Sequence, residues 1–397
     1  MTETRVKALS IAERNRRWQA IRREMAARNL DALIIRGISS KWDGGTANVR
    51  YISQIGGNGE EALAVFPSAG DPTVFIWASS QLKWWPIAQD WVKDVRLGSP
   101  SWAQTCVERL KDLGHARGRI GVVGIGGGSD AGRCLSHDIY QGIRDGLPGA
   151  QFAPASDIFE RMRLRKSSEE IACIAKATEL GDLSVKAMLE AAAQPGVKAH
   201  EVYAEILHAA FRAGGESPMF LMYEADPSPQ HALRFPSDRM LKRGYMILQE
   251  IMPKYAGYFS QVMVPVSIGE PDPLYRRLER TVIDAYGEAI RAIRPGATTR
   301  QVAAQLNQPI VDAGLTWTRP QWQGIGLENV EQPTDTDFPG RIGTSPEVVL
   351  EEGMILGLQP MAALPDATKG LQMGDTVVVT RSGVKRLGTT EMRMHVV

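Results

Sequence analysis

Over the first 160 residues, short apolar runs alternate with stretches in which apolar side chains recur at helical spacing. The helical stretches are residues 12–29 and 102–113. The apolar runs are bounded by Gly, Pro or Asp, which is typical of buried strands. They cover residues 31–35, 62–66, 73–77 and 120–123. The pattern predicts a small α/β domain over residues 1–160.

A different order of elements begins near Lys166 and occurs twice. Ser167 stands three residues before Glu170, the spacing of a capping box, which predicts a helix from this point to Ala193. A helix at 198–213 and strands at 245–251 and 258–268 follow. Helices at 273–293 and 299–313 and strands at 354–358 and 376–380 then repeat the order. This predicts an α+β domain over residues 161–397, with helices packed outside a curved antiparallel sheet.

The bulk composition excludes several classes of partner. The chain has 397 residues, long enough for two domains, and its net charge is +1, so we expect neither nucleic acid nor a membrane surface as a partner. No apolar stretch reaches the roughly 20 residues of a membrane span, and the first residues lack the apolar segment of a signal peptide. The three cysteines form no C-x-x-C pair. We therefore expect a cytoplasmic protein without a disulfide framework or a thiolate zinc site.

A glycine-rich segment at 124–129 (GIGGGS) follows a predicted strand, which is the context of a dinucleotide-binding loop. Ser129 occupies the third glycine position of that motif. We therefore favour a turn over a cofactor loop, and we expect no cofactor.

Several short motifs follow one another in the second domain. They are 163–167 (RLRKS) with Glu170, 257–258 (GY), 324–327 (GIGL) with Glu331, 352–354 (EGM) with Pro360, and 375–380 (DTVVVT) with Gly383. In order and spacing they resemble the superfamily of creatinase, prolidase and methionine aminopeptidase, peptidase family M24. The first 160 residues resemble the N-terminal domain of creatinases and proline-specific aminopeptidases. The resemblance implies a pita-bread fold for the second domain, a homodimer and a small-molecule substrate.

In the metallopeptidase members of this superfamily, two Asp, one His and two Glu side chains hold two divalent metals. Aligned on the flanking motifs, this chain has other residues there, namely Glu250, Gln261, Gln323, Gln359 and Gly374. Neutral amides supply no charge to offset the repulsion of two dications, and glycine supplies no ligand. We therefore expect no metal. Asp375 lies next to the last position, but shifting it would not replace the other ligands.

His231, in 229–233 (PQHAL), matches the catalytic histidine of creatinase, a metal-free amidinohydrolase of the superfamily. The resemblance implies that His231 transfers protons, for which an imidazole is suited. The alternative is a structural hydrogen bond. For Glu250 we expect pairing with His231 or a role as a second acid/base group, the alternative being a salt-bridged strand residue.

The three glutamines, Gln261, Gln323 and Gln359, offer donors and acceptors that suit recognition of an amide, urea or guanidine-like group. Alternatively, they fill vacated space and hydrogen-bond one another. Glu331 matches a family glutamate next to the cleft and is a further substrate-binding candidate. The resemblance places Arg341 in the loop that often shapes substrate selectivity in this superfamily, where it could bind a carboxylate; the alternative is an exposed loop arginine without such a role.

The leading hypothesis is a metal-independent, creatinase-like hydrolase or lyase that acts on a C–N or related bond of a small polar metabolite. The two glutamates that grip the guanidinium of creatine in creatinase align with Met263 and Gln359, so creatine itself is not expected. One alternative is a divergent Xaa-Pro-type aminopeptidase of family M24. The other is a non-catalytic pita-bread binding protein.

Overall fold

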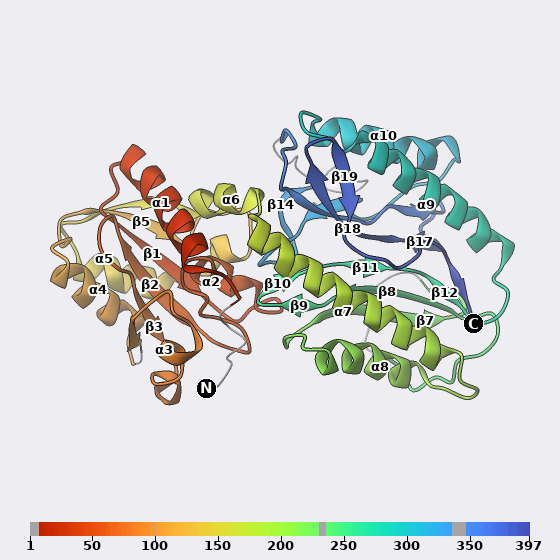
Figure 1. The fold of residues 1–397 in the computed structure, drawn as a ribbon, viewed down its shortest axis with the longest axis horizontal. Coiled ribbons are helices and arrows are strands. Elements are labelled where there is room, and N and C mark those ends of the chain that lie inside the picture. The colour runs from red at the N-terminus through yellow and green to blue at the C-terminus, as the bar shows by residue number, and fades with distance from the viewer. Residues whose placement is uncertain (1–7, 99, 230–235, 336–346) are drawn as a thin grey trace. The chain divides into compact units, whose positions relative to one another are not determined.

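The structure is a computed structural model that describes residues 8–98, 100–229, 236–335 and 347–397. The chain divides into two compact units, Met1–Glu170 and Ile171–Val397, coloured from red to yellow-green and from yellow-green to blue in Figure 1. Among the described helices, none combines the length and the apolar character that crossing a membrane requires.

Unit 1 is built on a six-stranded mixed sheet with the strand order β4-β3-β2-β1-β5-β6. Strand β1 pairs antiparallel with β2 and parallel with β5. The strands are β1 (Ala32–Gly37), β2 (Ala62–Pro67), β3 (Thr73–Ile76), β4 (Asp94–Leu97), β5 (Arg119–Val123) and β6 (Gln151–Pro154). Strands β1, β2, β3 and β5 confirm the four runs predicted from the apolar pattern.

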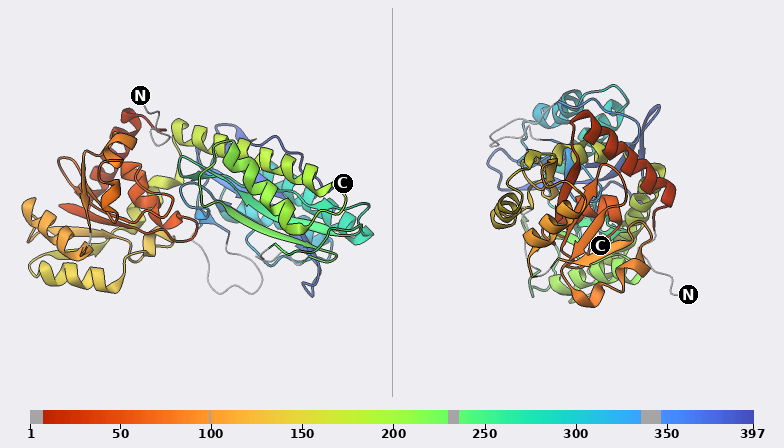
Figure 2. Two further views of the ribbon diagram at one scale, coloured as in Figure 1. Left: turned by 90° about the horizontal axis from the view of Figure 1, so that it is seen from below. Right: turned by 90° about the vertical axis from the view of Figure 1, so that its left-hand side faces the viewer.

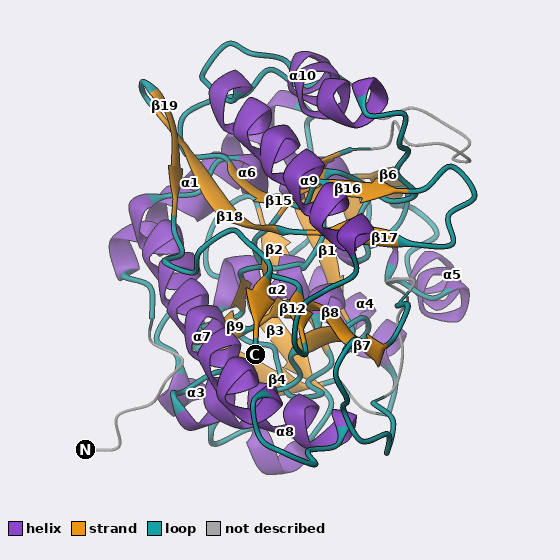
Figure 3. Ribbon diagram, turned by 90° about the vertical axis from the view of Figure 1, so that its right-hand side faces the viewer, coloured by secondary structure: helices purple, strands orange, loops and turns teal. Residues whose placement is uncertain are grey.

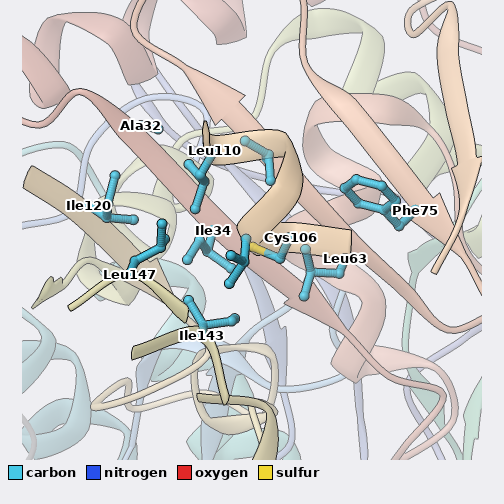
Figure 4. Close-up of a cluster of buried hydrophobic side chains, with 11 residues drawn as sticks. Ala32, Ile34, Leu63, Phe75, Cys106, Leu110, Ile120, Ile143 and Leu147 are labelled. Carbon is cyan, nitrogen blue, oxygen red and sulfur yellow. The ribbon is translucent and has the colours of Figure 1, made fainter. Parts of the chain in front are cut away.

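Helices cover both faces of this sheet, which explains why every residue of β1 is buried. On one face, Ile34 packs with Cys106 and Leu110 of α4 and with Ile143 of α5 (Figure 4). On the other face, the ring of Trp18 of α1 meets Phe66 of β2 edge-on. The helices are α1 (Ile11–Ala27), α2 (Ala47–Ser53), α3 (Trp85–Ala88), α4 (Trp102–Asp112), α5 (His137–Gly146) and α6 (Ser156–Leu164), with short 3₁₀ turns at Gly44–Thr46, Ser79–Gln81 and Ala131–Arg133.

The glycine-rich segment forms a turn whose amide groups have an internal partner. Oε1 of Glu160, on α6, accepts hydrogen bonds from the backbone N–H of Gly128 at 2.7 Å and of Ser129 at 3.1 Å. A carboxylate of the same unit therefore occupies the position at which a dinucleotide-binding loop would receive a phosphate.

Unit 2 contains a ten-stranded sheet, with the order β14-β13-β15-β18-β11-β8-β12-β20, in which β19 also pairs with β18 and β7 with β8. All pairs are antiparallel except β12 with β20. Its strands are β7 (Phe220–Asp226), β8 (Met246–Met252), β11 (Val262–Met263), β12 (Val266–Ser267), β13 (Trp322–Gly324), β14 (Glu331–Thr334), β15 (Ile355–Leu358), β18 (Gly374–Thr380), β19 (Gly383–Arg386) and β20 (His395–Val396). Two small two-stranded sheets complete the unit, β9 (Lys254–Tyr255) with β10 (Tyr258–Phe259) and β16 (Met361–Ala363) with β17 (Gly370–Gln372).

Two helix pairs accompany the sheet, as the repeated sequence pattern predicts. They are α7 (Ser168–Ala192) with α8 (Ala199–Arg212), and α9 (Pro273–Ala292) with α10 (Thr299–Asp312). The first pair lies beside β7 and β8, and the second beside the β17–β19 region (Figures 1 and 3). The left view of Figure 2 shows α7 and α8, in yellow-green, running along the sheet. The capping box is confirmed, because Ser167 Oγ accepts from the N–H of Glu170 and the Glu170 carboxylate accepts from the N–H of Ser167.

The prediction of one continuous strand over 258–268 is wrong. The segment breaks into β10, β11 and β12. At the first break, the backbone N–H of Gln261 donates to the side-chain hydroxyl of Thr376 at 2.7 Å, and that hydroxyl donates back to the carbonyl of Gln261 at 3.1 Å. At this point the side chain of Thr376, rather than a backbone group of a neighbouring strand, bonds the backbone of Gln261 and holds it on the sheet.

Candidate functional site

Three of the residues selected from the sequence form one hydrogen-bonded cluster in unit 2. Nε2 of Gln261 donates to Oε1 of Glu250 and to Oε1 of Gln359, each at 2.6 Å. Nε2 of Gln359 donates in turn to the carbonyl of Pro320 at 2.8 Å. Glu250 lies on β8, Gln261 precedes β11, and Gln359 follows β15. We call these three side chains the Glu250 cluster.

The backbone fixes the orientation of both amides in the Glu250 cluster. The carbonyl of Pro320 can only accept, so it selects the nitrogen of Gln359 and leaves Oε1 of Gln359 as an acceptor. That oxygen selects the nitrogen of Gln261, which then also donates to Glu250. Both N–H groups of Gln261 are therefore used within the cluster. The contact between Gln261 and Gln359 is the mutual hydrogen bonding that the sequence left open as an alternative for these glutamines.

The pKa of Glu250 is raised to about 7, chiefly because burial disfavours the charged carboxylate. The hydrogen bond from Gln261 and the positive charge of Arg319 act in the opposite direction. A carboxyl with a pKa near 7 exists in both protonation states at neutral pH. It is therefore able to donate or accept a proton.

The packing around Gln261 requires a glycine on the neighbouring strand. A Cβ at Gly357 would lie 2.1 Å from Oε1 of Gln261 and 2.4 Å from Cδ1 of Ile325. Gly357 pairs with Gln323 across β13 and β15, and Gln323 donates from Nε2 to the carbonyl of Asn329 at 3.3 Å. Gln323 thus lies on the adjacent strand, and its amide bonds to a backbone carbonyl rather than to the Glu250 cluster.

Position 374 has no room for a side chain in this backbone. A Cβ on Gly374 would lie 1.8 Å from the carbonyl oxygen of Leu358. The neighbouring Asp375 does not substitute for it. Its carboxylate accepts from the hydroxyl of Tyr286 at 2.6 Å and from Nε of Arg386 at 2.7 Å. Successive residues of a strand face opposite sides, and so Asp375 points away from Thr376 and Gln261.

The remaining sequence-selected residues lie elsewhere or outside the described residues. The carboxylate of Glu331 accepts from the backbone N–H of Glu328 at 3.2 Å and packs against Gly326. His231 and Arg341 lie outside the described residues, so the expected pairing of His231 with Glu250 stays a prediction. Over the described ranges, no group of three or more His, Cys, Asp and Glu side chains is placed to hold a metal ion.

The structure adds one residue that the sequence reasoning missed. Arg319 precedes Pro320, and its Nη1 lies 3.9 Å from Sδ of Met222. Met222 on β7 is the register partner of Glu250 on β8, which places the guanidinium at the level of Glu250. In the sequence, the one hint of this residue was its position, four residues before Gln323 and just ahead of the 324–327 motif of the family resemblance.

Two protein-family models match the chain. "Metallopeptidase family M24" matches residues 172–381, and "Creatinase/Prolidase N-terminal domain" matches residues 17–165. Together they confirm the predicted fold class, a pita-bread α+β domain preceded by a creatinase-type α/β domain.

Similar proteins carry names from the same group. The Xaa-Pro dipeptidase of Pyrococcus furiosus is 27% identical over 66% of this chain and 73% of its own length. The creatinase of a Bacillus species is 22% identical over 70% of this chain and 68% of its own length. The crystal structure of an X-Pro aminopeptidase from Thermotoga maritima superposes with a TM-score of 0.80 at 19% identity, covering 96% of this chain and 99% of that one, which supports the fold alone.

Proposed function

The chain belongs to metallopeptidase family M24, and from this premise we propose that it hydrolyses a C–N bond of a small polar substrate without a resident pair of metal ions. The observation that carries the proposal is the Glu250 cluster, in which two amides and one carboxyl hydrogen-bond at positions aligned with metal ligands of metallopeptidase members. We propose metal independence because creatinase, a member of the superfamily that the chain resembles, works without a metal.

The side chains present do not fit two adjacent dications. Such a pair needs several anionic oxygens, and the Glu250 cluster offers the single carboxyl of Glu250. The amide of Gln261 directs both N–H groups into the cluster, where they would face a cation with positive hydrogen atoms. Gly374 has no side chain, and Asp375 is held by Tyr286 and Arg386. The donor set therefore favours chemistry by organic side chains.

Glu250 has the properties of a proton-transfer group for this hydrolysis. Water adds across the C–N bond, so that the hydroxyl joins the carbon and a proton joins the departing nitrogen. Gln261 holds Oε1 of Glu250, which leaves Oε2 to exchange the proton. The pKa of about 7 allows that exchange near neutral pH. His231 is the second proton-transfer group implied by the resemblance to creatinase, and it lies outside the described residues.

A second candidate, a dipeptidase of the Xaa-Pro type, is favoured by one specific observation. The relative from Pyrococcus furiosus, which matches two thirds of the chain, is named an Xaa-Pro dipeptidase. Under this candidate the substrate is a dipeptide, and a divalent metal takes part despite the poor donor set.

Turnover after metal removal separates the two candidates. The purified chain is treated with a chelator, analysed for metal content and assayed for amine release from N-acetyl amino acids, N-carbamoyl amino acids and Xaa-Pro dipeptides. We expect turnover to survive chelation and to disappear in Glu250→Gln and in His231→Ala. The matched control is Glu352→Gln, a half-exposed surface residue paired with Arg381, which should leave turnover unchanged.

The dipeptidase candidate predicts the opposite result of this assay. Turnover that chelation abolishes, with two equivalents of manganese, cobalt or zinc per chain, contradicts metal independence and supports the dipeptidase candidate. Ligand-induced thermal stabilisation without any product would instead support a binding protein.

A further inference from the structure

Unit 1 contains a pocket of about 380 Å³ at one end of the strands β2, β3 and β4. It lies on the face of the sheet where Leu63 and Phe75 pack with α4 (Figure 4). We call it the Trp77 pocket. The residues that line it are Gly59, Glu61, Trp77, Pro100 and Trp102. The proposed function makes no use of this pocket, so a ligand bound there would be a second property of the chain.

The strand register brings a carboxyl and two indoles together in the Trp77 pocket. Strands β2 and β3 pair antiparallel, and their register sets Glu61, just before β2, opposite Trp77, just after β3. Strand β4 pairs parallel with β3, which sets Gly98 beside Trp77. A Cβ on Gly98 would lie 2.3 Å from Cζ3 of Trp102, so the Trp102 ring takes the place of a side chain there. Register neighbours point to the same face of a sheet, and so these three side chains share one face.

One internal contact shows what kind of group these side chains attract. Cζ of Arg36 lies 4.4 Å from the centroid of the Trp102 ring, and Nη2 of Arg36 donates to Oε2 of Glu61 at 2.5 Å. An indole and a carboxylate thus hold a guanidinium between them. Nη1 of Arg36 also donates to the carbonyl of Ala62 at 3.0 Å, which helps to fix this arrangement. Arg36 is buried, whereas 43% of the Glu61 side chain remains exposed.

Trp77 adds a second indole, and this one is open to solvent. It is 52% exposed, although an indole gains much free energy from burial. Among the described residues that line the pocket, the one ionisable side chain is that of Glu61, which is acidic. The faces of an aromatic ring are electron-rich and attract cations. An anion would therefore be repelled by the carboxylate and by both rings.

The hydrogen-bonding groups of the pocket narrow the class of cation. Oε2 of Glu61 is already used by Arg36, and an indole N–H donates only. A guanidinium or a primary ammonium would leave most of its N–H groups without an acceptor side chain. A methylated ammonium has no such need, because its methyl groups carry the charge to the ring faces.

We propose that the Trp77 pocket binds a small quaternary ammonium compound, with Trp77 and Trp102 against its methyl groups and Glu61 as the counter-charge. The volume of the pocket is at the lower end of the range for small-molecule sites. A compound of the size of choline matches that volume.

A pair of compounds that differ in charge alone tests the proposal. Choline is compared with 3,3-dimethylbutan-1-ol, in which a carbon atom replaces the nitrogen and the shape is the same. Ligand-observed NMR titrations of the full chain at pH 7 give the two dissociation constants. We expect choline to bind roughly tenfold more tightly than the alcohol, the combined effect of two indoles and a carboxylate. A merely apolar pocket would prefer the alcohol.

Two variants of Trp77 and one control assign the preference to the pocket. Trp77→Leu should lower the choline-to-alcohol affinity ratio at least about threefold, and Trp77→Phe should lower it less, because a phenyl face attracts cations less strongly than an indole. The control is Trp84→Leu. Trp84 is another tryptophan of unit 1, 44% exposed, whose ring meets Trp85 and does not line the pocket. This control should keep the wild-type ratio.

Thermal unfolding shows whether each variant is folded, and Trp77→Phe carries the test should Trp77→Leu fail to fold. The proposal is wrong if choline does not bind, if the alcohol binds as tightly, or if the ratio is unchanged in the folded Trp77 variants. Trimethyllysine that binds within a peptide but not as the free amino acid would indicate a protein partner and overturn the small-molecule assignment. Turnover and metal content do not enter these measurements, so the proposed function stands or falls separately.

Discussion

Nε2 of Gln261 lies 2.6 Å from Oε1 of Glu250, eleven residues earlier in the chain. The contact joins a buried carboxyl to an amide whose other N–H is already used by Gln359. An amide N–H favours the ionised form of its partner, whereas burial favours the neutral form. The balance leaves Glu250 with a pKa of about 7. Proton binding at Glu250 thus depends on its burial and on the hydrogen bond from Gln261.

The first prediction concerns stability as a function of pH. The pKa of Glu250 is raised from 4.5 to about 7 on folding, so the folded state holds this proton more strongly than the unfolded state. The resulting stabilisation is present below about pH 4.5 and is lost as the pH rises through about 7. Because Glu250→Gln has no proton to lose, its stability relative to the wild type should rise by roughly 3 kcal/mol over this interval. Urea unfolding at a series of pH values measures the difference.

Glu352→Gln is the control for this series, since Glu352 is half-exposed on the surface. Its stability relative to the wild type should vary little with pH. A difference between wild type and Glu250→Gln that stays constant from pH 4.5 to 7.5 would show that Glu250 is ionised throughout, as it would be beside a bound cation.

The second prediction concerns the side-chain amide of Gln261, which donates to Oε1 of Glu250 and to Oε1 of Gln359. Gln261→Met keeps the volume but removes the donor to Glu250, so the pKa of Glu250 should rise further and the pH profile of turnover should move upward. Gln249→Met is the matched control. Gln249 is buried, as Gln261 is, and lies on β8 next to Glu250. Its amide donates to the carbonyl of Val264 at 2.7 Å, on the face of the strand opposite to Glu250. Both variants should lose stability, by about 1–3 kcal/mol, but a shift of the profile in Gln249→Met as well would remove Gln261 from this role.

The third prediction uses two glycines in unit 2. Gly374→Ala places a methyl group 1.8 Å from the carbonyl oxygen of Leu358, so strands β15 and β18 must shift apart. We expect a loss of at least about 2 kcal/mol in the free energy of unfolding. Gly287→Ala, in α9, has its nearest neighbour at 3.5 Å and should instead gain about 0.5–1 kcal/mol through helix propensity. Equal effects of the two changes in chemical unfolding would contradict the close approach at Gly374.

The elements with strong periodic patterns were predictable from the sequence. The long helices α7 and α9 and the buried strand β1 confirm predictions based on caps and apolar spacing. Helix α2 (Ala47–Ser53) was missed because it directly follows a glycine-containing 3₁₀ turn, Gly44–Thr46, whose N-cap, Asp43, is left-handed with φ of 68°. The break at Gln261 was also missed, because it depends on the hydroxyl of Thr376, 115 residues away in the chain.

The site was predictable to the extent that it follows the family motifs. Spacing from those motifs placed Glu250, Gln261 and Gln359 at positions that the structure brings into contact. It did not reveal that Gln261 uses both N–H groups internally, since hydrogen-bond direction depends on the carbonyl of Pro320. Arg319 belongs to no motif, and its place near Glu250 depends on a contact with Met222, which the pairing of β7 with β8 sets opposite Glu250.

The bonds from Gly128 and Ser129 to Glu160 have a consequence for evolution of the small unit. A tethered carboxylate competes intramolecularly for these N–H groups, so a dissolved nucleotide would have to displace it. Even a substitution that introduced glycine at position 129 would leave this anion in place. Acquiring nucleotide affinity here would first require the loss of Glu160.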